Sequence, residues 1–119
     1  MDYKDFGKFI NVKQDANLKI IQAVTSKDVS SFDLNSFGDC NCCSLGKFCN
    51  ELPDTLKKDP DVRNLVTTHD KFHKEGLKLL TLVKNGDIKS AVEGLKPNSP
   101  FNNVNKEVLA QLKLLRDKK

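Results

Sequence analysis

Hydrophobic residues recur at steps of three and four along most of the chain, the spacing that places them on one face of an α-helix. The clearest segment begins at Asp59, a residue type that caps helices, and Pro60, which is tolerated in a first helical turn. Asn85 and Gly86 are typical of a helix end. A long helix is therefore expected between them. Its apolar face consists of Val62, Leu65, Val66, Phe72, Gly76, Leu80 and Val83.

The N-terminal half carries a weaker version of the same pattern. A first helix is expected from about Tyr3 to Thr25. Its apolar side is formed by Phe6, Phe9, Ile10, Ile20, Ala23 and Val24. Residues 26–41 are rich in Ser, Asp, Asn and Gly, which favours a loop. A short helix is then expected from near Cys43 to Pro53, with Leu45, Phe48 and Leu52 on its apolar side.

Two more helices are expected in the C-terminal third. One follows Asp87 and carries Ile88, Ala91, Val92 and Leu95. The last begins at Ser99-Pro100, and its apolar face is formed by Phe101, Val104, Val108, Leu112 and Leu115. Strand patterns are nearly absent. The sequence therefore predicts an all-α protein, an antiparallel bundle of four or five helices, with residues 1–119 as a single domain.

Composition agrees with this class. The chain has 119 residues, of which 38% are hydrophobic and 30% charged, as expected for one globular core. No apolar run approaches the roughly 20 residues that span a bilayer, and the N-terminus MDYKDFGKFI does not resemble a secretory signal. We therefore expect a cytoplasmic protein without a membrane partner. The net charge of +4 is spread along the chain, and its basic tail lacks aromatic residues, so no nucleic-acid partner is expected.

The candidate chemistry begins with the only two histidines, His69 and His73. Four residues apart on a helix, they lie on one face about one turn apart and can converge on one metal ion. They also continue the apolar face of the long helix, and a polar ring that faces a core needs a partner there. The alternative interpretation is a pair of hydrogen-bonded core histidines, but the nearby cysteines favour a metal.

Four cysteines, Cys40, Cys42, Cys43 and Cys49, lie within ten residues. A disulfide framework would link distant segments, whereas such a cluster in a cytoplasmic protein indicates metal or redox chemistry. Cys49 stands beside Phe48 inside the expected short helix, so we expect it to be a small packed residue rather than a ligand.

Two motifs resemble those of a known family. They are Cys43-Ser-Leu-Gly-Lys-Phe48 and His69-Asp-Lys-Phe-His73, and they resemble the bacterial chemoreceptor zinc-binding domain. The likeness extends over roughly residues 9 to 116 and includes the Pro-Phe start of the last helix. It implies a helical bundle, often a homodimer, that binds Zn²⁺ through three histidines and one cysteine. Such domains report zinc or oxidant levels to a signalling partner, and this chain would be a stand-alone or excised copy.

One family ligand has no counterpart here, because the first helix contains no histidine. The stretch where it is expected holds Lys13, Asp15, Ala16 and Asn17. Structural zinc sites have four ligands, so three replacements compete. Cys40 would form a Cys-x-x-Cys pair with Cys43 and is favoured, with Cys42 as a less regular substitute. Asp15 lies away from the apolar side of its helix, and the third candidate is water or an exogenous ligand.

The predicted zinc ligands are therefore Cys40, Cys43, His69 and His73. Asp70 beside His69 imitates the acid of zinc peptidases, but a zinc with four protein ligands leaves no position for a catalytic water. We expect no enzyme. The predicted function is a zinc-binding regulatory or sensor module in bacterial signalling, whose partner is a signalling protein or a second copy. Oxidation of Cys43 would release the metal. The alternatives are a metal-free interaction bundle and a zinc buffer.

Overall fold

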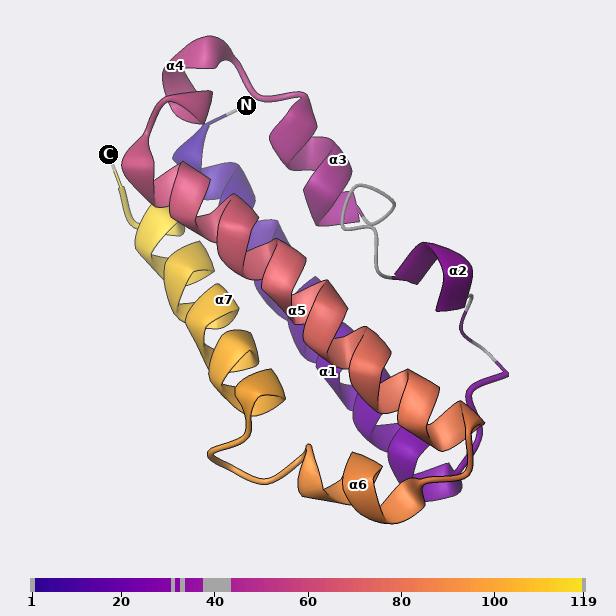
Figure 1. The fold of residues 1–119 in the computed structure, drawn as a ribbon. Coiled ribbons are helices and arrows are strands. Elements are labelled where there is room, and N and C mark those ends of the chain that lie inside the picture. The colour runs from indigo at the N-terminus through magenta and orange to yellow at the C-terminus, as the bar shows by residue number, and fades with distance from the viewer. Residues whose placement is uncertain (1, 31, 33, 38–43, 119) are drawn as a thin grey trace.

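The structure, a computed structural model, describes residues 2–30, 32, 34–37 and 44–118, and these contain helices but no strand. The predicted all-α bundle is confirmed. In chain order, the elements are a 3₁₀ helix η1 (Tyr3–Gly7), α1 (Lys8–Ser26), α2 (Leu34–Phe37), α3 (Ser44–Asn50), α4 (Asp54–Lys57), α5 (Pro60–Lys84), α6 (Ile88–Glu93) and α7 (Pro100–Arg116) (Figure 1). None of these helices is long and apolar enough to cross a bilayer.

Side-chain caps fix the start of the last three helices, as their sequences predict. The N-cap residues are Asp59 for α5, Asp87 for α6 and Ser99 for α7, and each side chain accepts a backbone N–H of its first turn. Pro60 and Pro100 occupy the first turns of α5 and α7, where a missing N–H costs no intrahelical bond. These local signals explain why the C-terminal half matches the expected boundaries closely.

The three long helices form the body of the bundle. The α1 and α5 helices run in the same direction with a constant offset, because Tyr3 bonds to Asp59 and Lys13 contacts His69, both 56 residues further along. The α7 helix runs antiparallel to the other two, as the predicted bundle requires. Both chain ends therefore lie at one end of the bundle (Figure 1). Parallel α1 and α5 require a return connection along the bundle, and α2, α3 and α4 form it.

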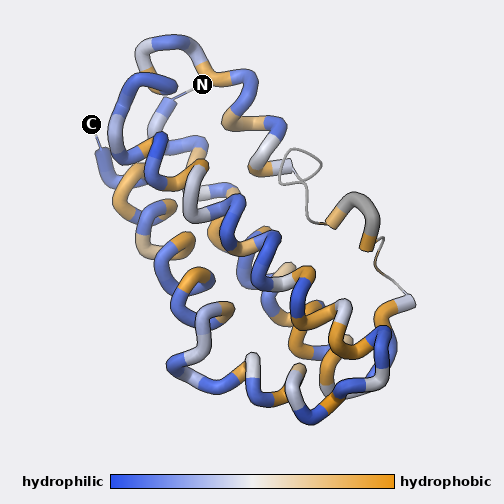
Figure 2. Tube along the Cα trace, in the orientation of Figure 1, coloured by the Kyte–Doolittle hydropathy of each residue, from blue (hydrophilic) through white to orange (hydrophobic). Residues whose placement is uncertain are grey.

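The core lies between these helices, and hydrophobic positions recur along each of them (Figure 2). Its fully buried side chains include Phe6, Ile20, Val24, Leu45, Leu65, Phe72, Leu80, Phe101, Val108, Leu112 and Leu115. Two expected core residues are exposed, Val66 by 42% and Val92 by 49%, because they lie at the outer edges of their helices. Gly76 permits a close approach, since a Cβ there would stand 2.9 Å from the Phe37 ring and 3.1 Å from Ile20.

The N-terminal half differs from the prediction in detail. The first helix begins as the 3₁₀ turn η1 and becomes α-helical at Lys8. The expected loop of residues 26–41 contains the short helix α2, and α4 was not expected. Within the described chain, the helix expected near Cys43 begins at Ser44.

Candidate functional site

The two histidines lie side by side on the face of α5 that packs into the bundle. His69 is 2% exposed and His73 is 6% exposed. Their Nε2 atoms are 3.0 Å apart, and their rings meet edge to face with centroids 4.6 Å apart. The expectation that both rings point into the core, toward one another, is confirmed.

A backbone carbonyl fixes the orientation of His73. Its Nδ1 lies 2.8 Å from the carbonyl oxygen of Phe37, the last residue of α2. A carbonyl only accepts hydrogen bonds, so Nδ1 carries a proton, and in the neutral form of the ring Nε2 presents a lone pair. Histidines that bind metals usually donate their other ring N–H in this way. The Phe37 ring also packs against the His73 imidazole, with centroids 5.1 Å apart.

The third nitrogen of the site belongs to Lys13 of α1, which is only 2% exposed. Its Nζ lies 2.8 Å from His69 Nε2 and 5.1 Å from the centroid of the Phe72 ring. Sequence reasoning placed Lys13 in the stretch where a histidine ligand was expected, but gave it no role. Its position three residues after Ile10 and seven before Ile20 continues the apolar face of α1, and this spacing was the available signal.

Two neighbours of Lys13 on α1, Asp15 and Asn17, differ in their exposure to solvent. Asp15, considered above as a ligand, is exposed, so it does not share the buried surroundings of the histidines. Asn17 lies one helical turn after Lys13 and is partly buried. Its Oδ1 atom is buried and has no hydrogen-bond partner among the described residues.

The hydrogen-bond roles in this cluster bring two ring nitrogen acceptors close together. An ammonium group only donates, so His69 Nε2 accepts from Lys13 and cannot also donate to His73. The single lone pair of His69 Nε2 is then directed at Lys13, and Nε2 of a neutral His73 presents its lone pair 3.0 Å away. Two nitrogen ligands of a tetrahedral zinc, each at 2.0–2.1 Å, stand roughly 3.3 Å apart, close to this separation. The two imidazole nitrogens are therefore spaced so that both could bind one metal ion.

The predicted cysteine ligands Cys40 and Cys43, and the substitute Cys42, lie outside the described residues, and their role stays a prediction. The chain that carries them runs between Phe37, whose carbonyl bonds to His73, and Ser44, the first residue of α3. Cys49 is buried in the hydrophobic core, as expected. Among the described residues, no group of three His, Cys, Asp or Glu side chains forms a metal site.

Asp70 does not imitate a catalytic acid in this structure. Its carboxylate lies 2.8 Å from Lys74 one turn along α5, and its side chain is partly exposed. Asp70 therefore lies at the partly exposed edge of α5, paired with a lysine of the same helix.

A second polar cluster joins both chain ends to the start of α5. The Tyr3 hydroxyl donates to Asp59 at 2.6 Å, and Lys118 Nζ donates to Asp59 at 2.9 Å and lies 2.6 Å from Asp61. The hydrogen bond from Tyr3, followed by that from Lys118, lowers the pKa of Asp59 to about 2. The two carboxylates raise the pKa of Lys118. We call Tyr3, Asp59, Asp61 and Lys118 the terminal cluster.

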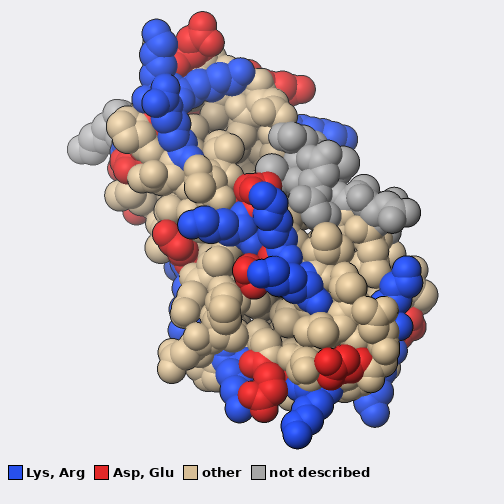
Figure 3. Space-filling model, viewed as in Figure 1, with Lys and Arg blue, Asp and Glu red and all other residues tan. Residues whose placement is uncertain are grey.

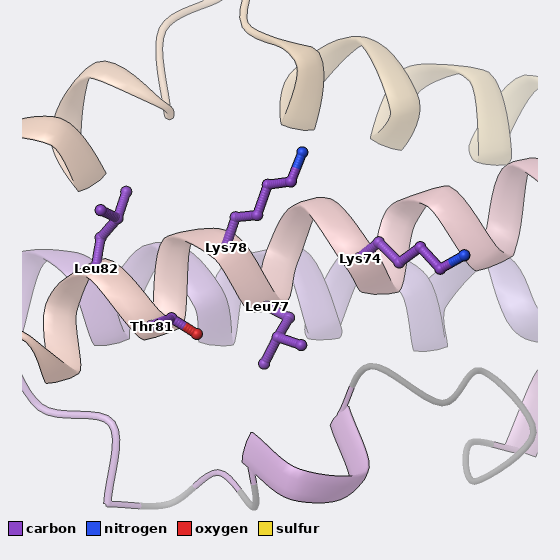
Figure 4. Close-up of a pocket in the computed structure, with 5 residues that line it drawn as sticks. All are labelled: Lys74, Leu77, Lys78, Thr81 and Leu82. Carbon is purple, nitrogen blue, oxygen red and sulfur yellow. The ribbon is translucent and has the colours of Figure 1, made fainter.

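The outer surface offers a different kind of feature. A shallow groove of about 630 Å³ along α5 is lined by Lys74, Leu77, Lys78, Thr81 and Leu82, side chains that point to different sides of the helix (Figure 4). Its two lysines pair with Asp70 and Glu75. On the face seen in Figure 3, basic and acidic side chains are interspersed. The groove lining contains no metal-ligating side chain. The buried nitrogens of Lys13, His69 and His73, which we call the nitrogen cluster, are therefore the better candidate site.

Comparison with known proteins gives no match: no family model fits the chain, and no curated protein or solved structure resembles it significantly. The likeness to the chemoreceptor zinc-binding domain therefore rests on its two motifs. Function is inferred from the side chains themselves.

Proposed function

We propose that this chain is a zinc-binding regulatory module in which His69 and His73 supply two nitrogen ligands. The observation that carries the proposal is the pair of buried Nε2 atoms 3.0 Å apart, with the His73 ring held by the Phe37 carbonyl. Imidazole nitrogen is a preferred zinc ligand, and the interior of a bundle is a usual place for such sites. We expect the module to be non-catalytic.

Cys43 and Cys40 are proposed to complete the site. Cys40 follows Phe37 by three residues, and an extended chain of that length spans at most roughly 11 Å. Phe37 is already in hydrogen-bond contact with His73, so a thiolate from this segment has a short path to the histidines. Zinc bound in this way would hold the thiolates deprotonated and join two separate segments of the chain.

Regulation follows from this connection. Zinc would link α5 to the chain between α2 and α3, so occupancy of the site changes how tightly that chain is held against the bundle. We propose that a signalling protein or a second copy of this chain detects the change. Loss of zinc after oxidation of Cys43 would release the same chain and would be detected in the same way.

A metal-free interaction bundle is the competing function, and one contact favours it. Lys13 already donates to His69, so one imidazole has a buried partner without any metal. In that case, a chelator leaves the melting temperature unchanged and His69→Ala affects stability only.

The deciding experiment measures zinc by plasma mass spectrometry in protein purified without added metal. We expect about one equivalent per chain, and a loss of more than about 100-fold in affinity for His69→Ala and His73→Ala. Cys43→Ala is compared with Cys49→Ala, a buried cysteine outside the proposed site, which should retain the metal. Less than about a tenth of an equivalent in the wild type, and no binding on titration, would contradict the proposal.

A further inference from the structure

We infer that the ammonium group of Lys13 occupies the metal position in the metal-free protein, and that zinc binds only when this group moves away. The inference rests on the proposed zinc site. It concerns a residue of α1 that the likeness to zinc-binding domains does not assign as a ligand.

The first step is that Lys13 and a metal compete for the same electrons. Nζ lies 2.8 Å from His69 Nε2, within hydrogen-bond distance. An ammonium nitrogen has three N–H donors and no lone pair, so it takes up the lone pair of Nε2 rather than acting as a ligand beside it. A metal needs that lone pair too. Because two cations also repel one another at this distance, ammonium and metal exclude each other.

The second step is that the position of Lys13 is well defined. The residue is 2% exposed, and its Nζ stands 5.1 Å from the centre of the buried Phe72 ring. The face of an aromatic ring attracts cations. Burying a charge is costly without partners, so these contacts hold the ammonium beside Nε2 of His69, the atom that would bind the metal. Lys13 thus balances the lone pair of His69 while metal is absent.

The third step is a destination for the displaced group. Asn17 lies four residues after Lys13, and side chains at this spacing are neighbours on a helix. Helical side chains lean toward the N-terminus, so Asn17 leans over the turn that carries Lys13. Its buried Oδ1 has no partner among the described residues. On metal binding, the N–H···N bond to His69 breaks and an N–H···O bond to Asn17 forms, with no proton transferred.

The consequence is an affinity set by competition. The apparent dissociation constant equals the intrinsic one divided by the fraction of molecules in which Lys13 has moved away. Lys13 therefore raises the zinc concentration at which the module responds. Removing its amine should strengthen binding, whereas removing a ligand weakens it.

The test compares zinc affinity in the wild type, Lys13→Leu and Lys19→Leu. Leucine has no ligating atom, and Lys19 is an exposed lysine of the same helix. We expect Lys13→Leu to bind zinc at least about ten-fold more tightly and Lys19→Leu to match the wild type. Unchanged or weaker binding by a folded Lys13→Leu would overturn the inference. Weaker binding would instead make Lys13 a zinc ligand.

A second measurement needs no variant. The wild-type protein is acetylated at its amines with and without zinc, and the modification rates of Lys13 and Lys19 are compared by mass spectrometry. On zinc binding Lys13 leaves the buried nitrogen of His69 for Asn17, a residue that is only partly buried, so we expect zinc to accelerate modification of Lys13 several-fold relative to Lys19. Zinc also suppresses unfolding, which lowers the reactivity of buried lysines, so the expected sign is opposite to that of simple stabilisation. An unchanged or slower Lys13 rate would overturn the inference.

The two proposals fail in different ways. If the wild type binds zinc but Lys13→Leu binds it no better, only the role of Lys13 is wrong. If neither protein binds zinc, the proposed function fails and the inference with it. Binding by Lys13→Leu in the absence of wild-type binding would contradict the proposed function of the natural chain, while supporting the exclusion of metal by Lys13.

Discussion

Lys118 and Lys13 both contact α5 or its N-cap, but their partners differ. The partners of Lys118 are carboxylates in a structural ion pair, whereas the partner of Lys13 is a nitrogen that is proposed to bind a metal instead. Lys118 is 28% exposed and lies between the carboxylates of Asp59 and Asp61 at the start of the helix. Lys13 is almost fully buried and lies against an imidazole nitrogen in the middle of the helix. Both sites join α5 to the N-terminal part of the chain at the same offset of 56 residues.

The chemistry of the partners decides what each lysine can do. Carboxylates are anions near neutral pH, and Asp59 and Asp61 hold Lys118 in ion pairs. The lone pair of an imidazole nitrogen can accept a hydrogen bond from an ammonium group or bind a metal ion. The terminal cluster is therefore expected to stabilise the fold, whereas the nitrogen cluster is expected to bind zinc and to change its contacts when zinc binds.

The largest expected effect comes from removing the ring that lies beneath the nitrogen cluster. Phe72 is buried and contacts Lys13, His73 and Phe101. Phe72→Ala should lower the free energy of unfolding by about 3–5 kcal/mol in urea denaturation, because it leaves a large cavity.

Leu80→Ala provides the matched control for this prediction. Leu80 is equally buried on the same helix, and its truncation should cost about 2–5 kcal/mol. Only Phe72→Ala should also change zinc affinity, since Phe72 positions both Lys13 and His73. Equal changes in affinity for the two variants would show that the site responds to bundle stability alone.

The part of the fold that sequence predicted well is the part specified locally. Caps and proline positions place α5, α6 and α7, because each signal acts within one helical turn. The direction of α1 relative to α5 was not predicted. It depends on a return connection through three short helices whose packing is not encoded in any one of them.

In the candidate site too, the features set by local sequence were predicted and those that depend on distant segments were not. The inward orientation of His69 and His73 follows from their place on the apolar face of α5, and was predicted. Lys13 was missed as a site residue because lysine is almost never fully buried, although its spacing marked a core position. The carbonyl of Phe37 could not be predicted, since it is a backbone group brought to His73 from 36 residues away.

Removing the centre of the terminal cluster should have the next largest effect. Asp59 caps α5 and accepts from Tyr3 and Lys118. Asp59→Ala should reduce stability by about 2 kcal/mol, the upper end of the range for a lost cap. Asp87→Ala removes the cap of the six-residue helix α6 and should cost less when both variants are measured by thermal unfolding. A larger loss for Asp87→Ala would contradict a stabilising role for the terminal cluster.

The pH dependence of stability should reveal the same carboxylate. The pKa of Asp59 is about 2 in the folded protein, below its ordinary value of 3.8, so the folded state favours the ionised form. Its contribution is complete above about pH 4 and is lost as the pH falls through about 2. Asp59→Asn should flatten this part of the stability profile, as measured by urea unfolding of the metal-free protein from pH 5 to pH 2. A profile as steep as that of the wild type would assign the acid sensitivity to other groups.

The smallest expected effect is the most direct test that the two regions are independent. Tyr3→Phe removes the hydroxyl that donates to Asp59 and keeps the ring near Lys118. Stability should fall by about 1 kcal/mol at neutral pH, the usual value of a single hydrogen bond. Zinc affinity should stay within about two-fold of the wild type, because distant sites without shared partners act additively. If Tyr3→Phe shifted zinc affinity as much as Lys13→Leu does, the shared register of α1 and α5 would couple the two clusters, and the terminal cluster would be part of the response.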